Sequence, residues 1–263
     1  MNLTRHADRR ALVTGGGSGI GQATVLRLLA EGGSVVAADI SEAGLKDTEQ
    51  KAGAAAGRLT TLVVDVADEE SVRAGVAAAV AALGGLDVLV NAAGVLRSSH
   101  THETSLDSFE QVLRINLTGT FLMIREAIPA LLEGEDAAVV NFSSTSAAFA
   151  HPYMAAYAAS KGGIQSMTHA LASEYAKRGI RFTAVQPGSI SSGMTDGSGA
   201  SGQSHGPGLP EDADFSLFAK LTPAIGQGFA GPETVASVVA MLASEDGAFI
   251  TGTEIRVDGG THF

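Results

Sequence analysis

A tyrosine and a lysine stand four residues apart in residues 157–161, Tyr-Ala-Ala-Ser-Lys. Side chains at this spacing lie next to each other on one face of a helix. A tyrosine hydroxyl has a pKa of about 10, and a neighbouring ammonium group favours the phenolate. The pair therefore predicts a general acid or base, with Lys161 lowering the pKa of Tyr157. The same spacing also occurs on helices without a catalytic role, so the interpretation needs support from other segments.

A glycine-rich turn near the start of the chain predicts a site for nucleotide phosphates. Residues 14–21 read Thr-Gly-Gly-Gly-Ser-Gly-Ile-Gly, between an apolar run at residues 11–14 and apolar residues with helical spacing. Glycines let the backbone approach a pyrophosphate, and the helix N-terminus offers free N–H groups. The turn does not match the strict G-x-G-x-x-G pattern, so a turn that only packs a helix against a strand is an alternative.

A carboxylate ends the second predicted strand, residues 34–39. Asp39 stands 18 residues after Gly21, close to the spacing of about 20 at which an acidic residue meets the adenosine ribose of a dinucleotide. It would accept hydrogen bonds from the ribose hydroxyls of NAD and repel the 2′-phosphate of NADP. Neither Ser18 nor Ile40 supplies a cation for that phosphate. We therefore expect NAD rather than NADP, with a helix cap as the alternative role of Asp39.

The rest of the chain alternates between predicted strands and helices. Helical patterns cover residues 42–56, 68–83 and 106–132, and further strands are expected at residues 59–66, 86–91, 137–142, 181–185 and 253–257. Strands rich in Val and Leu without polar alternation are typical of a parallel sheet covered on both faces. We expect an α/β fold, a Rossmann-like doubly wound parallel sheet of about seven strands with helices on both faces. Its ligand crevice, at the carboxyl ends of the strands, should be lined by Asp65, Asn91, Ser143, Ser144 and Pro187.

Composition limits the alternatives. A chain of 263 residues with 45% hydrophobic residues fits one domain over residues 1–263. The net charge of −11 and the pI near 5.0 argue against nucleic acid or an anionic membrane as a partner. The sequence contains no cysteine, which excludes disulfides and thiolate chemistry. The start of the chain lacks a signal-peptide pattern, and the Ala-rich run at 74–83 is too short to span a bilayer, so we expect a cytoplasmic protein.

The order of these motifs resembles the classical short-chain dehydrogenase/reductase family over nearly the whole chain. The matching segments are residues 14–21, Asp65-Val66, Asn91-Ala92-Ala93-Gly94, Asn116, Ser144, Tyr157 with Lys161, and Pro187-Gly188. Two positions depart from the family pattern. Ala92 is the second residue of a segment that is usually Asn-Asn-Ala-Gly, and Ser192 stands where a threonine commonly contacts the cofactor amide, with Thr195 nearby.

The resemblance implies hydride transfer between a nicotinamide and a carbon that bears an alcohol or ketone. It implies that Tyr157 exchanges the hydroxyl proton, while Ser144 binds the substrate oxygen. Ser144, not Ser143, stands 13 residues before the tyrosine, which is the family's spacing. Lys161 would hold the nicotinamide ribose, and Asn116 would anchor a water that links Lys161 to solvent.

The resemblance also implies a set of cofactor-binding residues and an assembly. The cofactor-binding residues would be Gly15, Gly17, Ser18, Gly19, Ile20, Gly21, Asp39, Ile40, Asp65, Val66, Asn91, Ala92, Gly94, Tyr157, Lys161, Pro187, Gly188, Ile190 and Ser192. A homo-oligomer, often a tetramer, is usual in the family. No metal site is expected, because His100 and His102 have no third ligand nearby in the sequence.

Residues 193–230 correspond to the part of the family that forms a lid over the substrate. After a Gly- and Ser-rich stretch, an amphipathic segment contains Phe215, Leu217, Phe218 and Leu221. These apolar side chains either cover a hydrophobic substrate or pack on the edge of the domain. His151 and Tyr153 are expected to shape the substrate pocket or to pack locally. A G-x-S-x-G match at residues 202–206 lacks the strand and helix that a hydrolase elbow needs.

We therefore expect an NAD-dependent secondary-alcohol dehydrogenase or ketone reductase with a hydrophobic substrate. An NADPH-dependent 3-oxoacyl-thioester reductase is the alternative within the same fold, and Asp39 argues against it. A non-catalytic NAD-binding regulator is the alternative from another class, since fold does not fix function. The intact set of Asn116, Ser144, Tyr157 and Lys161 argues against a regulator.

Overall fold

The computed structural model describes residues 4–196, 207–226 and 228–262. The G-x-S-x-G match and part of the expected lid lie outside these residues. One sheet contains seven parallel strands in the order β3-β2-β1-β4-β5-β6-β7. The strands are β1 (Arg10–Thr14), β2 (Ser34–Asp39), β3 (Leu59–Val63), β4 (Val88–Asn91), β5 (Ala137–Phe142), β6 (Ile180–Pro187) and β7 (Thr253–Val257). The expected doubly wound fold is confirmed.

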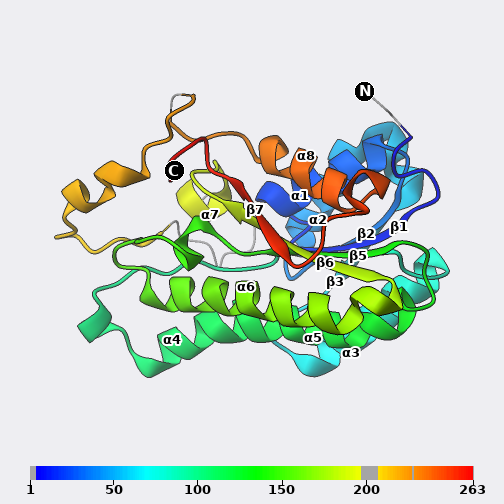
Figure 1. Cartoon of the computed structure of the whole chain (residues 1–263), viewed down its shortest axis with the longest axis horizontal. Helices are drawn as coiled ribbons and strands as arrows, with labels where there is room; N and C mark the ends of the chain where they lie inside the picture. The colour runs from blue at the N-terminus through cyan, green and yellow to red at the C-terminus, as the bar shows by residue number, and fades with distance from the viewer. Residues whose placement is uncertain (1–3, 197–206, 227, 263) are drawn as a thin grey trace.

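Helices cover both faces of the sheet (Figure 1). The helices α1, α2 and α8 lie on one side, and α3 to α6 lie on the other. Their bounds are α1 (Gly19–Ala30), α2 (Glu42–Ala52), α3 (Glu69–Leu83), α4 (Leu106–Leu113), α5 (Gly119–Leu131), α6 (Ala155–Tyr175), α7 (Gly193–Asp196) and α8 (Pro232–Leu242). Within the described parts of the chain, no helix is long and apolar enough to cross a membrane.

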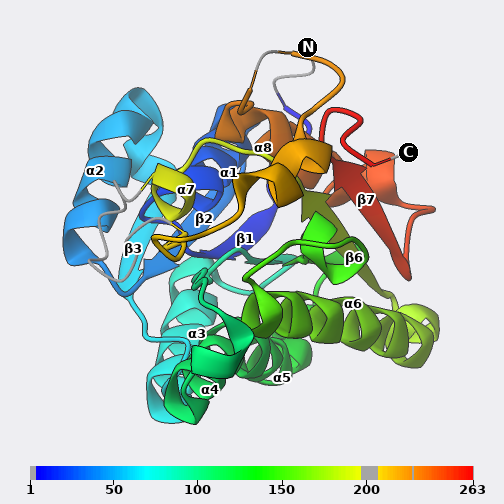
Figure 2. The same cartoon turned by 90° about the vertical axis from the view of Figure 1, so that its left-hand side faces the viewer.

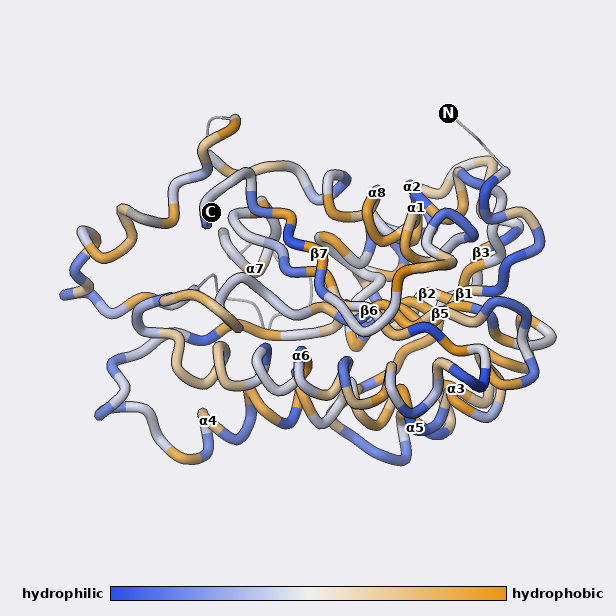
Figure 3. Tube along the Cα trace, viewed as in Figure 1, coloured by the Kyte–Doolittle hydropathy of each residue, from blue (hydrophilic) through white to orange (hydrophobic). Residues whose placement is uncertain are grey.

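The alternating side chains of the strands supply two hydrophobic cores. Leu12 packs with residues of α3, α5 and α6, whereas its neighbours Ala11 and Val13 pack with residues of α1 and α8. Successive strand residues point to opposite faces, so one strand serves both cores. Figure 3 shows the hydrophobic residues concentrated along the strands between the helix layers. This explains why the strands read as continuous apolar runs in the sequence.

Two predicted elements end earlier in the structure than in the sequence analysis. The helix expected over residues 42–56 ends at Ala52, because Gly53 takes a positive φ of 52° and a 3-10 segment follows. The strand expected over residues 59–66 ends at Val63, which pairs with the last residue of β2. β2 ends at this pair, and β3 has no strand on its other side because it lies at the edge of the sheet, so none of the described strands pairs with residues 64–66. The other strand bounds agree with the prediction to within two residues.

The long helical segment predicted over residues 106–132 contains a local widening. The helices α4 and α5 are joined by a π-helical turn, Arg114–Thr118. Such turns are rare, and they occur frequently at functional sites. Asn116 lies within this turn and is fully buried.

A partly buried ion pair fixes the amino end of the first strand. Asp87 Oδ2 accepts hydrogen bonds from the backbone N–H and the Nε of Arg10, each at 2.9 Å, and Oδ1 lies 2.7 Å from Nη2. These bonds to Arg10 outweigh burial and hold the pKa of Asp87 below its usual value. The pair therefore stabilises the contact between β1 and the start of β4.

We expect Asp87→Asn to lower the free energy of unfolding by about 2 kcal/mol at pH 7, because charge-assisted bonds in a buried site are lost. Because the pKa of Asp87 is lower in the folded state, its carboxylate stabilises the fold at a pH above its unfolded-state pKa of about 3.9. This stabilisation is lost as the pH falls through the folded-state pKa. The difference between the two proteins should therefore shrink below about pH 4. Urea titrations at several pH values measure this. The control Glu70→Gln, in an exposed pair with Arg73, should change stability little.

Candidate active site

A cleft of about 550 Å³ lies at the carboxyl ends of the strands. Most of the predicted site residues line it, as the fold requires. Those that line it are Gly15, Ser18, Gly19, Ile20, Gly21, Asp39, Ile40, Asp65, Val66, Ala92, Gly94, Ser144, Tyr157, Lys161, Pro187, Gly188, Ile190 and Ser192. Figure 2 views the molecule from this end, where the described lid segments and the C-terminal segment also lie.

Asn91 does not line the cleft, contrary to the expectation from its place at a strand end, and its role in cofactor binding stays a prediction. Its Nδ2 donates to Asn141 Oδ1 at 2.9 Å, and Asn141 Nδ2 in turn donates to Thr168 Oγ1 at 3.0 Å. The two asparagines are register partners on β4 and β5, so their side chains share the face of the sheet that carries α6. Gly17 is also absent from the lining of the cleft, but its N–H donates to Asp39 Oδ2 at 2.9 Å.

The turn between β1 and α1 is built for close backbone approach. Gly15 has a φ of 68°, and a Cβ there would lie 2.8 Å from the backbone N of Ala93. A Cβ on Gly21 would lie 2.0 Å from the carbonyl oxygen of Gly15. Ser18 makes no side-chain cap hydrogen bond, so the first turn of α1 keeps N–H groups for an anion. The turn therefore fits a dinucleotide pyrophosphate.

Asp39 lies at the edge of the cleft at the end of β2. Its carboxylate accepts hydrogen bonds from the N–H groups of Gly17 and Ser41, at 2.9 and 2.8 Å. Ser41, not Asp39, caps α2, because the Ser41 hydroxyl accepts from the N–H of Gly44 at 3.1 Å. The carboxylate is held in place by two backbone donors and fits ribose hydroxyls.

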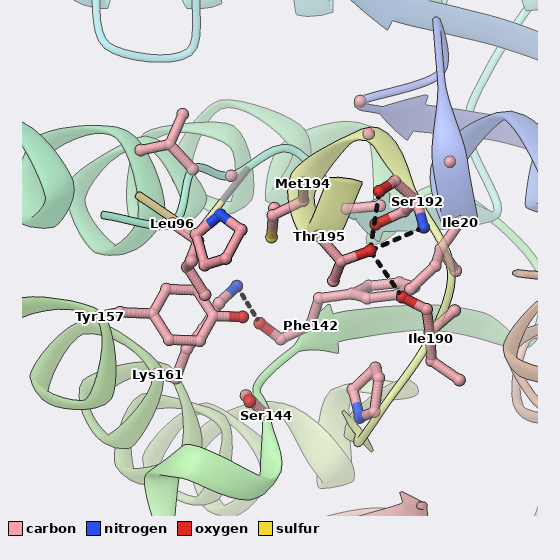
Figure 4. Close-up of a pocket in the computed structure, with 18 of the residues that line it drawn as sticks. Ile20, Leu96, Phe142, Ser144, Tyr157, Lys161, Ile190, Ser192, Met194 and Thr195 are labelled. Carbon is pink, nitrogen blue, oxygen red and sulfur yellow. Dashed lines mark hydrogen bonds between the residues drawn. The ribbon is translucent and has the colours of Figure 1, made fainter. Parts of the chain in front are cut away.

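The predicted catalytic side chains meet at the other end of the cleft (Figure 4). Tyr157 and Lys161 are buried on α6, and Lys161 Nζ lies 5.6 Å from the centre of the Tyr157 ring. Lys161 Nζ donates to the carbonyl of Phe142 at the end of β5, at 2.8 Å. Ser144 follows that strand, lines the cleft and exerts a lowering effect on the pKa of Tyr157. Ser143 donates its hydroxyl to the carbonyl of Lys161 at 3.0 Å and so acts structurally.

The structure reverses the predicted effect on the acidity of Tyr157. Burial raises the pKa of Tyr157 to about 12, and the hydrogen bond with Ser144 offsets this only in part. Burial also lowers the pKa of Lys161 to about 8. Desolvation disfavours both the phenolate form of Tyr157 and the ammonium form of Lys161. Tyr157 is therefore a protonated phenol at neutral pH, which suits a proton donor.

Asn116 connects the site to its surroundings without lining the cleft. Its Oδ1 accepts from the N–H of Val95 at 2.8 Å, and its Nδ2 donates to the carbonyl of Val95 and to Ser160 Oγ at 2.9 and 3.0 Å. A Cβ on Gly94 would lie 3.1 Å from Asn116 Oδ1 and 3.6 Å from Lys161 Nζ. Asn116 therefore ties the loop after β4 to α6, and its role as a water anchor stays a prediction.

The loop after β6 approaches the glycine turn. A Cβ on Gly19 would lie 3.2 Å from Ser192 Cβ. The N–H of Ser192 donates to Thr195 Oγ1 at 3.0 Å, and that hydroxyl also contacts the carbonyls of Ile190 and Ser192 (Figure 4). Thr195 therefore holds the loop, while Ser192 faces the dinucleotide part of the cleft.

Only part of the expected apolar cover lies over the cleft. Among the four aromatic and aliphatic lid residues, Phe218 and Leu221 line it, whereas Phe215 and Leu217 are 67% and 53% exposed. Several further residues contribute walls that the sequence analysis did not assign. These are Leu96, Thr145, Met154, Met194, Leu209, Thr261 and His262. They are widely separated in the sequence and carry no shared motif, so only the fold brings them together.

His100 pairs with a carboxylate of the lid region. Its Nε2 lies 2.8 Å from Asp212 Oδ1, and this contact raises its pKa. The described residues contain no group of three or more side chains that could hold a metal ion.

The chain matches known proteins over most of its length. The family model described as short chain dehydrogenase matches residues 9–201. The 3-oxoacyl-[acyl-carrier-protein] reductase of Thermotoga maritima is 34% identical over 249 residues, which cover 95% of this chain and 96% of that protein. The chain belongs to the short-chain dehydrogenase/reductase family. The predicted family is confirmed, and with it an oxidoreductase that uses a nicotinamide dinucleotide and acts on CH–OH groups.

Solved structures support the same assignment. A short chain dehydrogenase from Mycobacterium paratuberculosis bound to NAD has a TM-score of 0.88 and 32% identity, with 99% of both chains covered. A short chain dehydrogenase from Burkholderia cenocepacia in complex with NADP has a TM-score of 0.84 and 31% identity, with 98% of this chain and 99% of that chain covered. Both nicotinamide dinucleotides therefore occur among similar structures.

We expect Gly15→Ala to weaken dinucleotide binding and to lower the free energy of unfolding by about 1–3 kcal/mol. The added Cβ meets the backbone of residues 92 and 93, and the positive φ strains any L side chain. Fluorescence titration with NADH and thermal unfolding measure the two effects. Gly57→Ala is the control, since a Cβ there meets nothing within 4 Å. Equal NADH affinity of the two variants would contradict the assigned role of the turn.

Proposed function

We propose that this protein is an NAD-dependent dehydrogenase or reductase that interconverts a secondary alcohol and a ketone on a largely apolar substrate. One observation carries the proposal. Tyr157, Ser144 and Lys161 converge at one end of a cleft whose other end holds the glycine turn and Asp39. A dinucleotide that spans the cleft would bring its nicotinamide next to the Tyr157 hydroxyl.

The proton transfer follows from the protonation state of Tyr157. The bound dinucleotide supplies the hydride for reduction and accepts it in oxidation. With its pKa raised to about 12, Tyr157 donates its proton to the substrate oxygen as that oxygen gains charge. The Ser144 hydroxyl stabilises the same oxygen. Lys161, still largely protonated at pH 7, directs positive charge toward the site and offers donors to the ribose. The buried surroundings strengthen each of these interactions.

The apolar part of the substrate would contact the third hydrophobic cluster. Leu96, Met154 and Tyr157 belong to this cluster, and Met194 and Phe218 pack against it. These side chains also line the cleft, and Figure 4 shows Leu96 and Met194 beside the Tyr157 ring. Burial of a hydrocarbon group against them would contribute about 25 cal/mol per Å². This supports a hydrophobic ketone or alcohol.

The preference for NAD rests on the charge around the adenosine end. Asp39 presents a fixed carboxylate there, and a 2′-phosphate would be repelled. Lys161 is the sole lysine or arginine among the described residues that line the cleft, and it lies at the catalytic end. Within the part of the chain that the structure describes, no cation at the adenosine end therefore compensates the charge of a 2′-phosphate.

We expect kcat/KM with NADH to exceed kcat/KM with NADPH by about tenfold or more. This is the effect on the rate that one repulsive contact between Asp39 and the 2′-phosphate would have. Asp39→Asn should reduce this ratio by weakening NADH use and easing NADPH use. Absorbance at 340 nm with one ketone and both cofactors measures the ratio. Glu42→Gln is the control, because this exposed carboxylate starts α2 and pairs with Lys46. A wild-type preference for NADPH would overturn the assigned role of Asp39.

A second candidate is an NADPH-dependent 3-oxoacyl-thioester reductase. The observation in its favour is the 34% identity to the 3-oxoacyl-[acyl-carrier-protein] reductase of Thermotoga maritima. The same cofactor assay, run with an acetoacetyl thioester, separates it from the first proposal. A non-catalytic NAD-binding regulator would bind the dinucleotide without turnover of any ketone, alcohol or thioester.

We expect Tyr157→Phe to lower kcat for hydride transfer by about 10²–10⁴-fold while NADH still binds, because the proton donor is lost. Tyr175→Phe removes a hydroxyl near the other end of α6, and it should leave kcat unchanged. Steady-state kinetics and NADH fluorescence measure both properties. Full activity of Tyr157→Phe would exclude the proposed mechanism.

We also propose a cytoplasmic homo-oligomer, with a tetramer as the expected form. The exposed apolar side chains of Leu106 on α4 and Phe121 on α5 support an interface on this face. Light scattering after gel filtration measures the assembly.

A further inference from the structure

The cleft has two walls of different chemistry at its catalytic end. One wall is apolar and includes Leu96 and Met194. The other is polar and includes Thr145, His151 and His262. An apolar ketone would cover this wall without pairing the imidazole nitrogen of His151 that does not contact Thr145, and covering an unpaired polar group is costly. The substrate should therefore carry a second polar group that faces this wall.

His151 is fixed next to the catalytic serine. Its Nε2 lies 3.1 Å from Thr145 Oγ1, and Thr145 directly follows Ser144 in the chain. Thr145 is buried, and its hydroxyl also lies 3.5 Å from the carbonyl of Pro187. Among the described residues, no side chain or backbone group hydrogen-bonds the Nδ1 of His151. This nitrogen is therefore free to hydrogen-bond a substrate group near the reacting carbon.

The surroundings keep His151 uncharged. Burial and the neighbouring His262 lower its pKa to about 4. The ring of His262 lies 5.9 Å from that of His151, stacks on Phe149 and contacts Asp258 through Nδ1 at 3.3 Å. A neutral imidazole offers one donor and one acceptor. It suits a hydroxyl or carbonyl group better than a carboxylate, which gains most from a charged partner.

We propose that His151 is a specificity-determining residue that hydrogen-bonds a second, uncharged oxygen of the substrate. This inference rests on the proposed function. The substrate oxygen bound by Ser144 and Tyr157 belongs to the alcohol or ketone group that reacts. His151 contacts a hydroxyl or carbonyl group on a neighbouring carbon. The substrate class is accordingly a hydroxyketone or diol with an apolar body.

A matched pair of ketones tests this directly. The wild-type protein is assayed with NADH and NADPH on cyclohexanone and on 2-hydroxycyclohexanone. We expect kcat/KM for the hydroxyketone to be about tenfold higher, the effect of one good hydrogen bond. His151→Phe should bring the ratio of the two values close to one. His151→Gln, whose amide also donates and accepts, should restore part of the preference.

The control variant is His102→Phe. Its imidazole is 79% exposed and lies outside the cleft, so the wild-type ratio should persist. If His151→Phe does not fold, inhibition of the wild-type protein by alcohol products is measured in place of the variant's kinetics. Cyclohexane-1,2-diol should then inhibit at about tenfold lower concentration than cyclohexanol.

The outcomes distinguish a failure of this inference from a failure of the proposed function. Equal kcat/KM for both ketones, equal inhibition by both alcohols, or an unchanged ratio in His151→Phe overturns the role of His151 and leaves the ketone reductase intact. Absence of turnover with either cofactor and either ketone overturns the proposed function, and the inference falls with it.

Discussion

The parallel direction of all seven strands is the constraint on which the site depends. Every strand ends at the same edge, and β1 pairs with β2 on one side and β4 on the other. The connections after β1 and β4 therefore run in different directions and leave a cleft between them. The glycine turn, Asp39, Gly94, Ser144 and Pro187 each follow or end a different strand, and this topology alone brings them to one cleft.

Burial then sets the chemistry of the catalytic end. Tyr157 and Lys161 sit on one helix face, where desolvation raises the pKa of the phenol and lowers that of the amine. A phenol kept protonated is a proton donor that is ready for reduction. Oxidation requires the phenolate, which positive charge in the site would have to stabilise. Whether reduction or oxidation is faster therefore depends on how far positive charge in the site offsets the effect of burial on the pKa of Tyr157.

Buried polar contacts position the helix that carries these groups. Thr168 on α6 is tied through Asn141 to Asn91, and Ser160 is tied through Asn116 to the loop after β4. Buried side-chain amides that hydrogen-bond one another and their neighbours allow few alternative arrangements. Asn116 reaches its partners from the π turn, where the helical segment widens locally. Asn91 and Asn116 are motif positions whose side chains make structural contacts in the folded chain.

Glycine turns, apolar runs and strand-end residues are local signals, and they were enough to predict the fold class and much of the cleft lining. Local signals also predicted site roles for Tyr157, Lys161, Ser144 and Asp39, and all four residues line the cleft. The direction of the Asn91 side chain and the pKa of Tyr157 could not be predicted from local signals, because both depend on the groups that pack around them in the folded chain. The contact between the rings of His151 and His262 could not be predicted either, because the two residues are more than 100 positions apart in the chain. The polar wall that they form exists only once the strands are ordered in one sheet.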